Sequence, residues 1–302
     1  MNKNYIHLLL LLALCLVSCD DDEVNPRSNP LHVPPVIVPH PPGPDTTNPI
    51  ISIVSPTADA TILVIEYISV RVFVSDDREL EVVRVIRTDP DGSNQVLLSN
   101  FDVPEEYKNK LDFTISLTRE DLKLPKSAST AAYTVIVEAE DKGQNITKGF
   151  VNVTIHAPNL NKSEFIKTFS NVNIYGYLDW MGYTIPGDPK AALNLALLVM
   201  VDKDFDKKVS ETEWKKFAAD FNVKDQVWAA WDMDGDGKLG DSEFNKGMEK
   251  LNFFTEWDED KNNSLSSEEL GGGFFSRWDH NQDATLSRDE YEEKYFTYIL
   301  FS

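Results

Sequence analysis

Residues 50–157 alternate between apolar and polar side chains with a period of two. The clearest run, 67–75, places Ile68, Val70 and Val72 on one face and Ser69 and Arg71 on the other. Similar runs lie at 50–56, 80–88, 95–99, 111–118, 132–141 and 149–157. Seven short runs of this kind, separated by turn residues such as those of 89–94, predict an antiparallel β-sandwich.

The apolar spacing changes to that of helices after residue 188. Asp188 is a candidate N-cap with Pro189 at the first helical position, and 189–201 is predicted to be a helix. Farther along, apolar residues recur five, four and one positions before each of four acidic segments, as a helix face requires. The segment 159–187 has no clear period, although 163–169 is compatible with a short helix.

The four acidic segments, 202–213, 232–243, 258–269 and 279–290, share one pattern over twelve residues. Each has Asp first, Asp or Asn third and fifth, and Glu twelfth. This pattern and its apolar flanks resemble the EF-hand calcium loop. We therefore expect a multidomain chain, with an N-terminal all-β Ig-like sandwich followed by an all-α EF-hand domain at 159–302.

The resemblance implies a ligand set for up to four Ca²⁺ ions, because this hard cation takes six to eight oxygens. Side-chain oxygens would come from positions one, three, five and nine, a carbonyl from position seven, and two oxygens from the twelfth Glu. Carried over, the implied ligands are Asp202, Asp204, Asp206, Lys208, Ser210 and Glu213; Asp232, Asp234, Asp236, Lys238 and Glu243; Asp258, Asp260, Asn262, Ser264, Ser266 and Glu269; and Asp279, Asn281, Asp283, Thr285, Ser287 and Glu290.

The segments also depart from the EF-hand pattern. The sixth position requires a positive φ, which glycine adopts without strain, and only Gly237 supplies it. We therefore rank 232–243 as the best site. The loops start 30, 26 and 21 residues apart, and the run Gly271–Gly273 is expected to resist helix formation between the third and fourth loops.

The N-terminus has the features of a targeting segment. Lys3 precedes an apolar stretch that is too short to span a bilayer comfortably, and the stretch ends in LVSCD. This ending resembles the bacterial lipobox, which implies a signal peptide at 1–18 and lipidation of Cys19; an ordinary secretory signal is the alternative. The acidic run 20–23 resembles the export signal of surface lipoproteins of Bacteroidetes, whereas in enterobacteria an Asp here signals inner-membrane retention.

A proline-rich stretch completes the predicted anchor. Residues 19–49 are expected to form a semi-rigid linker that separates the anchor from the sandwich at 50–158. The sandwich resembles Ig-like or cadherin-like modules of bacterial surface lipoproteins. Acidic residues lie at its strand ends, where cadherin-like modules sometimes hold calcium: Asp76, Asp77, Glu140 and Asp141. Turn chemistry is the simpler explanation, because scattered acids are usually solvated.

Charge and composition argue against two classes of function, nucleic-acid binding and catalysis. A net charge of −21 argues against a nucleic-acid partner, and residues 201–302 hold 25 acidic against 13 basic side chains, a local excess of 12. The chain has no GxSxG or HExxH motif, and Cys19 would be an anchor rather than a nucleophile, so we expect no enzyme. Calcium and the membrane are the expected partners, with a protein or glycan partner possible through the sandwich.

Two functions fit this sequence. The first is an exported, lipid-anchored outer-membrane protein, displayed at the cell surface, in which Ca²⁺ stabilises the fold. The second is a calcium-dependent adhesin or a subunit of a surface binding complex. Structural calcium is favoured over sensing, because a site with Kd near 10⁻⁵ M is always occupied at the roughly millimolar calcium outside cells.

Overall fold

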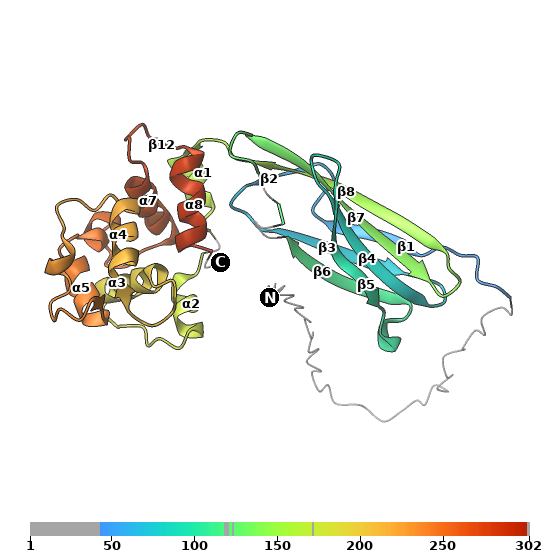
Figure 1. The fold of residues 1–302 in the computed structure, drawn as a ribbon, viewed down its shortest axis with the longest axis horizontal. Coiled ribbons are helices and arrows are strands. Elements are labelled where there is room, and N and C mark those ends of the chain that lie inside the picture. Colours follow the sequence, from blue (N-terminus) through green and yellow to red (C-terminus); the bar gives the residue numbers. More distant parts are fainter. Residues whose placement is uncertain (1–42, 118–120, 123, 171, 301–302) are drawn as a thin grey trace, which may run out of the picture. The chain divides into compact units, whose positions relative to one another are not determined.

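A computed structural model describes residues 43–117, 121–122, 124–170 and 172–300 (Figure 1). The predicted signal peptide, the lipidation site Cys19 and the linker up to residue 42 lie outside these residues. The described chain divides into two compact units. The first holds the chain up to Ile62 together with Tyr67–Ile155, and the second holds Leu63–Glu66 and the chain from His156 onward.

Among the described residues, the first unit contains eight strands in two sheets. The three-stranded sheet has the order β1-β3-β6, with β1 at Ile50–Ser55, β3 at Ile68–Ser75 and β6 at Lys110–Leu117. The five-stranded sheet has the order β2-β8-β7-β4-β5, with bounds Ala60–Leu63, Ile146–His156, Thr130–Asp141, Leu80–Thr88 and Asn94–Asp102. A short 3₁₀ helix, η1, covers Glu105–Tyr107.

The core of this unit is built by the alternation that the sequence shows. Val70, Val72 and Val74 of β3 are fully buried, and so are Val135 and Val137 of β7 in the other sheet. The seven predicted strands are present, and the coarse prediction of an all-β sandwich is confirmed. The eighth strand, β2, was missed because four residues are too few for a period to be recognised.

The second unit combines short helices with four two-residue strands. The helices are α1 (Lys162–Lys167), α2 (Ile174–Trp180), α3 (Pro189–Val201), α4 (Glu211–Asp220), α5 (Asp241–Glu249), α6 (Phe253–Trp257), α7 (Ser267–Trp278) and α8 (Arg288–Tyr298), with the 3₁₀ helix η2 at Trp228–Ala230. The strands are β9 (Leu160–Asn161), β10 (Val209–Ser210), β11 (Lys238–Leu239) and β12 (Thr285–Leu286).

The expected all-α EF-hand fold of this unit is wrong. The unit contains β structure, and its eight described helices are not arranged as EF-hands. The segment before the second loop is only the three-residue η2, and α6 before the third loop has five residues. The spacings of 26 and 21 residues between loops leave too little chain for a full pair of helices around each loop.

The strand of the fourth loop also has an unexpected partner. β12 pairs antiparallel with β9, so that Leu286 lies opposite Leu160, whereas β10 pairs with β11 and Val209 lies opposite Leu239. The hydroxyl of Tyr291 donates to the carbonyl of Pro158 at 3.0 Å and fastens the same segment. The segment after residue 158, whose structure the sequence pattern did not predict, therefore pairs with the strand of the fourth loop.

The expectation for the glycine run was also wrong, because all three glycines lie inside α7. An added Cβ at Gly273 would lie 2.2 Å from the ring of Trp257, and one at Gly271 would lie 3.2 Å from Phe169. The two rings therefore pack directly on the helix backbone. Burial of aromatic surface outweighs the cost of about 1 kcal/mol for each helical glycine.

Candidate metal centre

The four acidic loops follow one backbone path. Each has a positive φ at its sixth position, as the sequence predicts: Lys207, Gly237, Asn263 and Ala284. Each also has one at its fourth position, which was not predicted: Phe205, Gly235, Lys261 and Gln282. A left-handed conformation costs a non-glycine residue about 1 kcal/mol or more, so the loops that lack glycine maintain this path against strain.

Hydrogen bonds hold the first carboxylate of each loop in the same way. The backbone N–H of the sixth residue donates to it, over 2.8 Å from Lys207 to Asp202 and 3.2 Å from Gly237 to Asp232. The same bonds in the third and fourth loops measure 3.1 Å to Asp258 and 3.0 Å to Asp279. The loop backbone therefore curls around its first Asp in all four cases.

The twelfth Glu closes each loop from the other side. One oxygen of Glu213, Glu243, Glu269 and Glu290 accepts from the N–H of its ninth residue. The other oxygen accepts from an N–H at the second or third position. Each exiting helix thus begins with a carboxylate directed back over the loop. These bonds are charge-assisted and fix where the oxygens lie.

Carboxylate oxygens converge in three of the loops. One oxygen each of Asp202, Asp204 and Asp206 lies within 4.8 Å of the others, and the second loop gathers Asp232, Asp234 and Asp236 in the same way. The third loop gathers Asp258, Asp260 and Glu269. The fourth loop, where Asn281 replaces an Asp, does not form such a group among the described residues. Its ligand candidates keep the backbone arrangement and include three carboxylates, as many as those of the third loop.

The remaining predicted ligands lie at the ends of local elements. The seventh residues Lys238 and Thr285 open β11 and β12, Lys208 directly precedes β10, and Ser264 lies outside any strand. The ninth residues are N-caps of the exiting helices, and the hydroxyls of Ser210 and Ser266 accept from the twelfth-residue N–H. Ser287 caps α8 in the same position, and Gly240 caps α5 without a side chain.

Two of the loop carboxylates have buried oxygens that lack a full set of hydrogen-bond donors or positive charges around them. Asp202 is 1% exposed, and burial is the main cause that raises its pKa to about 6, with the nearby Glu213 and Asp206 adding to the rise. In the second loop, Oδ1 of Asp232 is buried and has no hydrogen-bond partner among the described residues. A buried acceptor without a donor is costly, and a cation at the centre of the loop would satisfy it.

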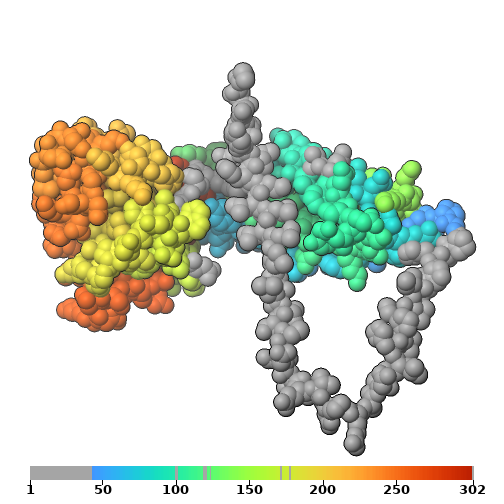
Figure 2. All heavy atoms as spheres, turned by 90° about the horizontal axis from the view of Figure 1, so that it is seen from below, coloured from blue at the N-terminus to red at the C-terminus, as the bar shows by residue number. Residues whose placement is uncertain are grey.

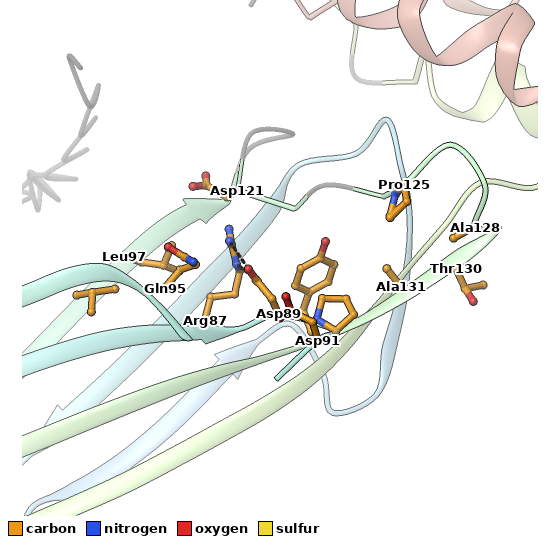
Figure 3. Close-up of a pocket in the computed structure, with 13 residues that line it drawn as sticks. Arg87, Asp89, Asp91, Gln95, Leu97, Asp121, Pro125, Ala128, Thr130 and Ala131 are labelled. Carbon is orange, nitrogen blue, oxygen red and sulfur yellow. Dashed lines mark hydrogen bonds and ion pairs between the residues drawn. The ribbon is translucent and has the colours of Figure 1, made fainter. Parts of the chain in front are cut away.

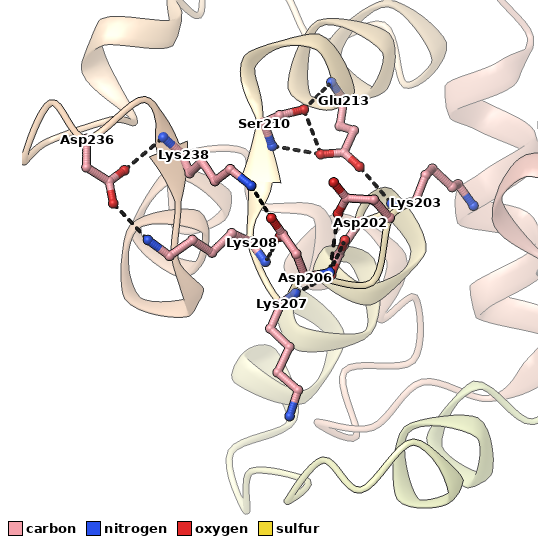
Figure 4. Close-up of polar contacts among 10 residues, drawn as sticks. Asp202, Lys203, Asp206, Lys207, Lys208, Ser210, Glu213, Asp236 and Lys238 are labelled. Carbon is pink, nitrogen blue, oxygen red and sulfur yellow. Dashed lines mark hydrogen bonds and ion pairs between the residues drawn. The ribbon is translucent and has the colours of Figure 1, made fainter.

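Two lysines cross between the first and second loops where β10 pairs with β11 (Figure 4). Nζ of Lys208 lies 2.8 Å from Asp236, and Lys238 pairs reciprocally with Asp206. Hydrogen bonds from these lysines lower the pKa of both carboxyls. In the space-filling view, residues from about 190 to 250, coloured yellow to orange, lie together on one surface (Figure 2). The lysine pairs were not foreseen from the sequence.

An aromatic interior lies behind the loops. Trp231, Trp257 and Trp278, directly before the second, third and fourth loops, are buried, which confirms that they are core residues. Trp231 makes an edge contact with Phe244 at 5.7 Å between ring centres. The two aromatics at the ends of the second loop therefore meet in the core. Val227, expected on the buried face, is instead 64% exposed.

The first unit contains a cavity of about 700 Å³ near one end of β4 and β7 (Figure 3). Arg87, Asp89 and Tyr133 line it. Arg87 donates to both oxygens of Asp89, at 2.5 and 3.1 Å, and its guanidinium lies 5.8 Å from the centre of the Tyr133 ring. The charges of Arg87 and Asp89 neutralise each other.

None of the described helices combines the length and the apolar character that a membrane span requires. No protein-family model matches the chain, and no curated protein matches it. Similarity is found only to solved structures, and it is weak. It carries no argument about function.

Three of the similar structures match at 9–14% identity. A fibronectin(III)-like module structure of CbhA from Clostridium thermocellum is 14% identical, with a TM-score of 0.22, over 37% of this chain and 47% of that one. A mutant β-glucosidase from Listeria innocua is 14% identical, with a TM-score of 0.24, over 35% and 16%. A β-1,2-glucanase from Parabacteroides distasonis is 9% identical, with a TM-score of 0.19, over 77% and 35%. The chain thus spans less than half of each protein.

The Ig-like part of the expected fold class is not retained. The chain is described by its strand orders alone, as a β-sandwich followed by a unit of short helices and strands.

Proposed function

We propose that this is an exported, lipid-anchored protein of the outer membrane, displayed at the cell surface, whose acidic loops bind Ca²⁺ and thereby stabilise its C-terminal unit. The observation that carries the proposal is the buried, unpartnered Oδ1 of Asp232 in a loop whose other carboxylates converge within 4.8 Å. Oxygen-only ligand sets suit Ca²⁺ better than transition metals, which favour imidazole and thiolate.

Electrostatics supports a stabilising role for the ion. The four loops carry fourteen acidic ligand candidates, and mutual repulsion destabilises the unit when no cation is bound. A site occupied at one hundred times its Kd contributes about 2.7 kcal/mol to the free energy of unfolding. Ca²⁺ outside a cell is constant enough to keep such a site filled, so the ion holds the fold rather than switches it.

Calorimetric titration of Ca²⁺ into the metal-free chain tests this proposal. We expect two to four equivalents, with the second loop among the tightest. Glu243→Gln should remove one equivalent, because the amide replaces one of two carboxylate oxygens and the negative charge. Glu249→Gln, at the end of the same helix but outside the loop, is the matched control. Absence of binding, or unchanged stoichiometry in Glu243→Gln, contradicts the proposal.

A second candidate function is a calcium-dependent adhesin or a subunit of a surface binding complex. Ile50 and Val54 of β1 and Phe150 of β8 are 66%, 55% and 71% exposed. β1 and β8 belong to different sheets and face each other at Ile51 and Gly149, so Phe150 and the two β1 residues point outward from their own sheets (Figure 1). Exposed apolar side chains as large as Phe150 are common at contact surfaces. Replacing Phe150 by Ser should abolish capture of a partner from surface extracts if this function holds, and leave Ca²⁺ binding unchanged.

A further inference from the structure

A cavity of about 540 Å³ lies between two connections of the second unit. Its walls come from 222–226, which lies between α4 and η2, and from 250–252, which lies between α5 and α6. Glu256 of α6 and Arg277 of α7 complete the lining. None of these residues is a ligand candidate of the four acidic loops. The cavity is therefore separate from the proposed calcium sites.

The backbone around this cavity holds unfavourable conformations. Outside the acidic loops, the described part of the second unit has three non-glycine residues with a positive φ, and all three line the cavity: Asn222 (51°), Asp225 (58°) and Asn252 (53°). Asn222 follows the end of α4, where the N–H of Val223 donates to the carbonyl of Ala218 at 2.8 Å. Asp225 ends no helix, so helix termination does not account for all three. Residues in this strained region cluster at ligand sites.

The cavity wall offers both hydrogen-bond donors and acceptors. The side chains of Asn222, Asp225 and Asn252 make no hydrogen bond to any described residue. Gln226 is held in place by the buried Trp231, whose indole N–H donates to its Oε1 at 3.2 Å. Amides and carboxylates together recognise hydroxyl groups, because a hydroxyl accepts from the amide N–H and donates to the carboxylate. The wall therefore suits a ligand with several hydroxyls.

The charge of the cavity lining is opposite in sign to that of its surroundings. Three basic and two acidic side chains line it: Lys224, Lys250 and Arg277, and Asp225 and Glu256. Residues 201–302 hold 25 acidic and 13 basic side chains, so this excess of positive charge is a local exception. Lys224 is exposed and forms no ion pair within the described chain. The lining therefore favours a negatively charged ligand.

Arg277 is arranged so that it can bind a carboxylate. Its guanidinium carbon lies 4.1 Å from the centre of the buried Phe253 ring, and this cation–π contact supports it. Its Nη2 pairs with Glu256, whose side chain is 54% exposed. So exposed a pair contributes little to stability, and a ligand carboxylate can therefore replace Glu256. A guanidinium donates two parallel hydrogen bonds to such a group.

We propose that this cavity binds an acidic sugar, either a uronic acid or a short oligosaccharide that contains one. Arg277 and Lys224 bind its carboxylate, and Asn222, Asp225 and Asn252 bind its hydroxyl groups. A volume of about 540 Å³ falls within the range of small-ligand sites, roughly 300–1,000 Å³. The site uses none of the loop carboxylates, so its failure would leave the proposed calcium binding untouched.

Calorimetric titration of the full chain, at saturating Ca²⁺, with trimers of galacturonate and of glucuronate tests this site. We expect one equivalent of at least one acidic trimer and no binding of the matching neutral trimers. Arg277→Gln and Lys224→Met should each weaken binding at least tenfold, because each removes a donor to the carboxylate. Glu256→Gln should strengthen binding severalfold, because it removes the competing carboxylate. Lys190→Met, at an exposed lysine of α3 outside the cavity, is the matched control and should change nothing.

Four outcomes overturn the inference: no binding of either acidic trimer, equal binding of a neutral trimer, equally tight binding of inorganic phosphate, or full affinity in Lys224→Met. If Arg277→Gln does not fold, Lys224→Met and Glu256→Gln decide, because both side chains are exposed. Their opposite effects on affinity are then the required result. The Ca²⁺ stoichiometry of these two variants should equal that of the native chain, which separates this site from the proposed calcium loops.

Discussion

The two units of this protein are stabilised by different means. In the first, β3 and β7 bury an uninterrupted set of valines between two sheets, so most of the interior is apolar. In the second, short helices carry an aromatic core, and the chain between them bends around converging carboxylates. Under the proposed function, the unit of short helices depends on cations held by its loop oxygens, whereas the apolar interior of the sandwich is stabilised by burial alone.

Removing a core aromatic behind the second loop should have the largest effect. Phe244 is fully buried between Trp231 and Phe217, at 5.7 and 5.9 Å between ring centres. We expect Phe244→Ala to destabilise the second unit by about 3–5 kcal/mol and to weaken Ca²⁺ binding at the second loop. Denaturant unfolding of the two units measures this. Val72→Ala should instead destabilise the first unit; a shared loss in both units would break the comparison.

Replacing the glycine at the sixth position of the second loop should destabilise the unit less. Gly237 has a φ of +84°, and an added Cβ would meet nothing within 4 Å, so Gly237→Ala tests backbone strain alone. We expect a loss of about 1 kcal/mol in the metal-free unit, measured by thermal unfolding. Gly187→Ala, which also has open space but no positive φ, should cost less. Equal losses in the two variants would show that the loop path is not strained.

Protonation of Asp202 at acidic pH should stabilise the metal-free second unit. Burial raises the folded-state pKa of this carboxyl from 3.8 to about 6, so the folded state holds its proton more tightly than the unfolded state. The resulting stability is fully present below about pH 4 and is lost as pH rises through 6. In Asp202→Asn this contribution to the pH dependence of the melting temperature should vanish. An unchanged pH profile in the variant would contradict the assignment.

The smallest effect is expected at the lysines that cross between the first two loops. Lys208 is exposed, so its pair with Asp236 contributes little to stability. Under the proposed function it would compete with the bound cation for the fifth-position carboxylate. We expect Lys208→Met to lower the Kd for Ca²⁺ in calorimetric titrations. Lys215→Met, which removes a similar exposed pair with Glu211, is the control. Identical affinities in both variants would exclude competition.

Prediction from sequence was most successful where a pattern is local. The alternation at 67–75 identified β3, and the need for a positive φ at Gly237 followed from its place in a repeated motif. Failures occurred where distant residues decide. The glycine run of α7 is helical because Trp257 and Phe169 pack on it.

The same limit explains the partners that were missed. β12 pairs with a strand more than one hundred residues earlier, and Asp45 meets Asp76 through tertiary folding. No local pattern encodes such contacts. The EF-hand resemblance predicted the positive φ at the sixth position of each loop but not the fold, because the loop path is set within twelve residues and the packing of the helices is not.

Scanning calorimetry of the metal-free chain with and without added Ca²⁺ tests the central claim most directly. At least one filled site should raise the melting temperature of the second unit by roughly 5–10 °C, as about 2.7 kcal/mol implies for a unit of this size. The main transition of the first unit should move less. A second unit that melts at the same temperature in Ca²⁺ and in EDTA would contradict the account.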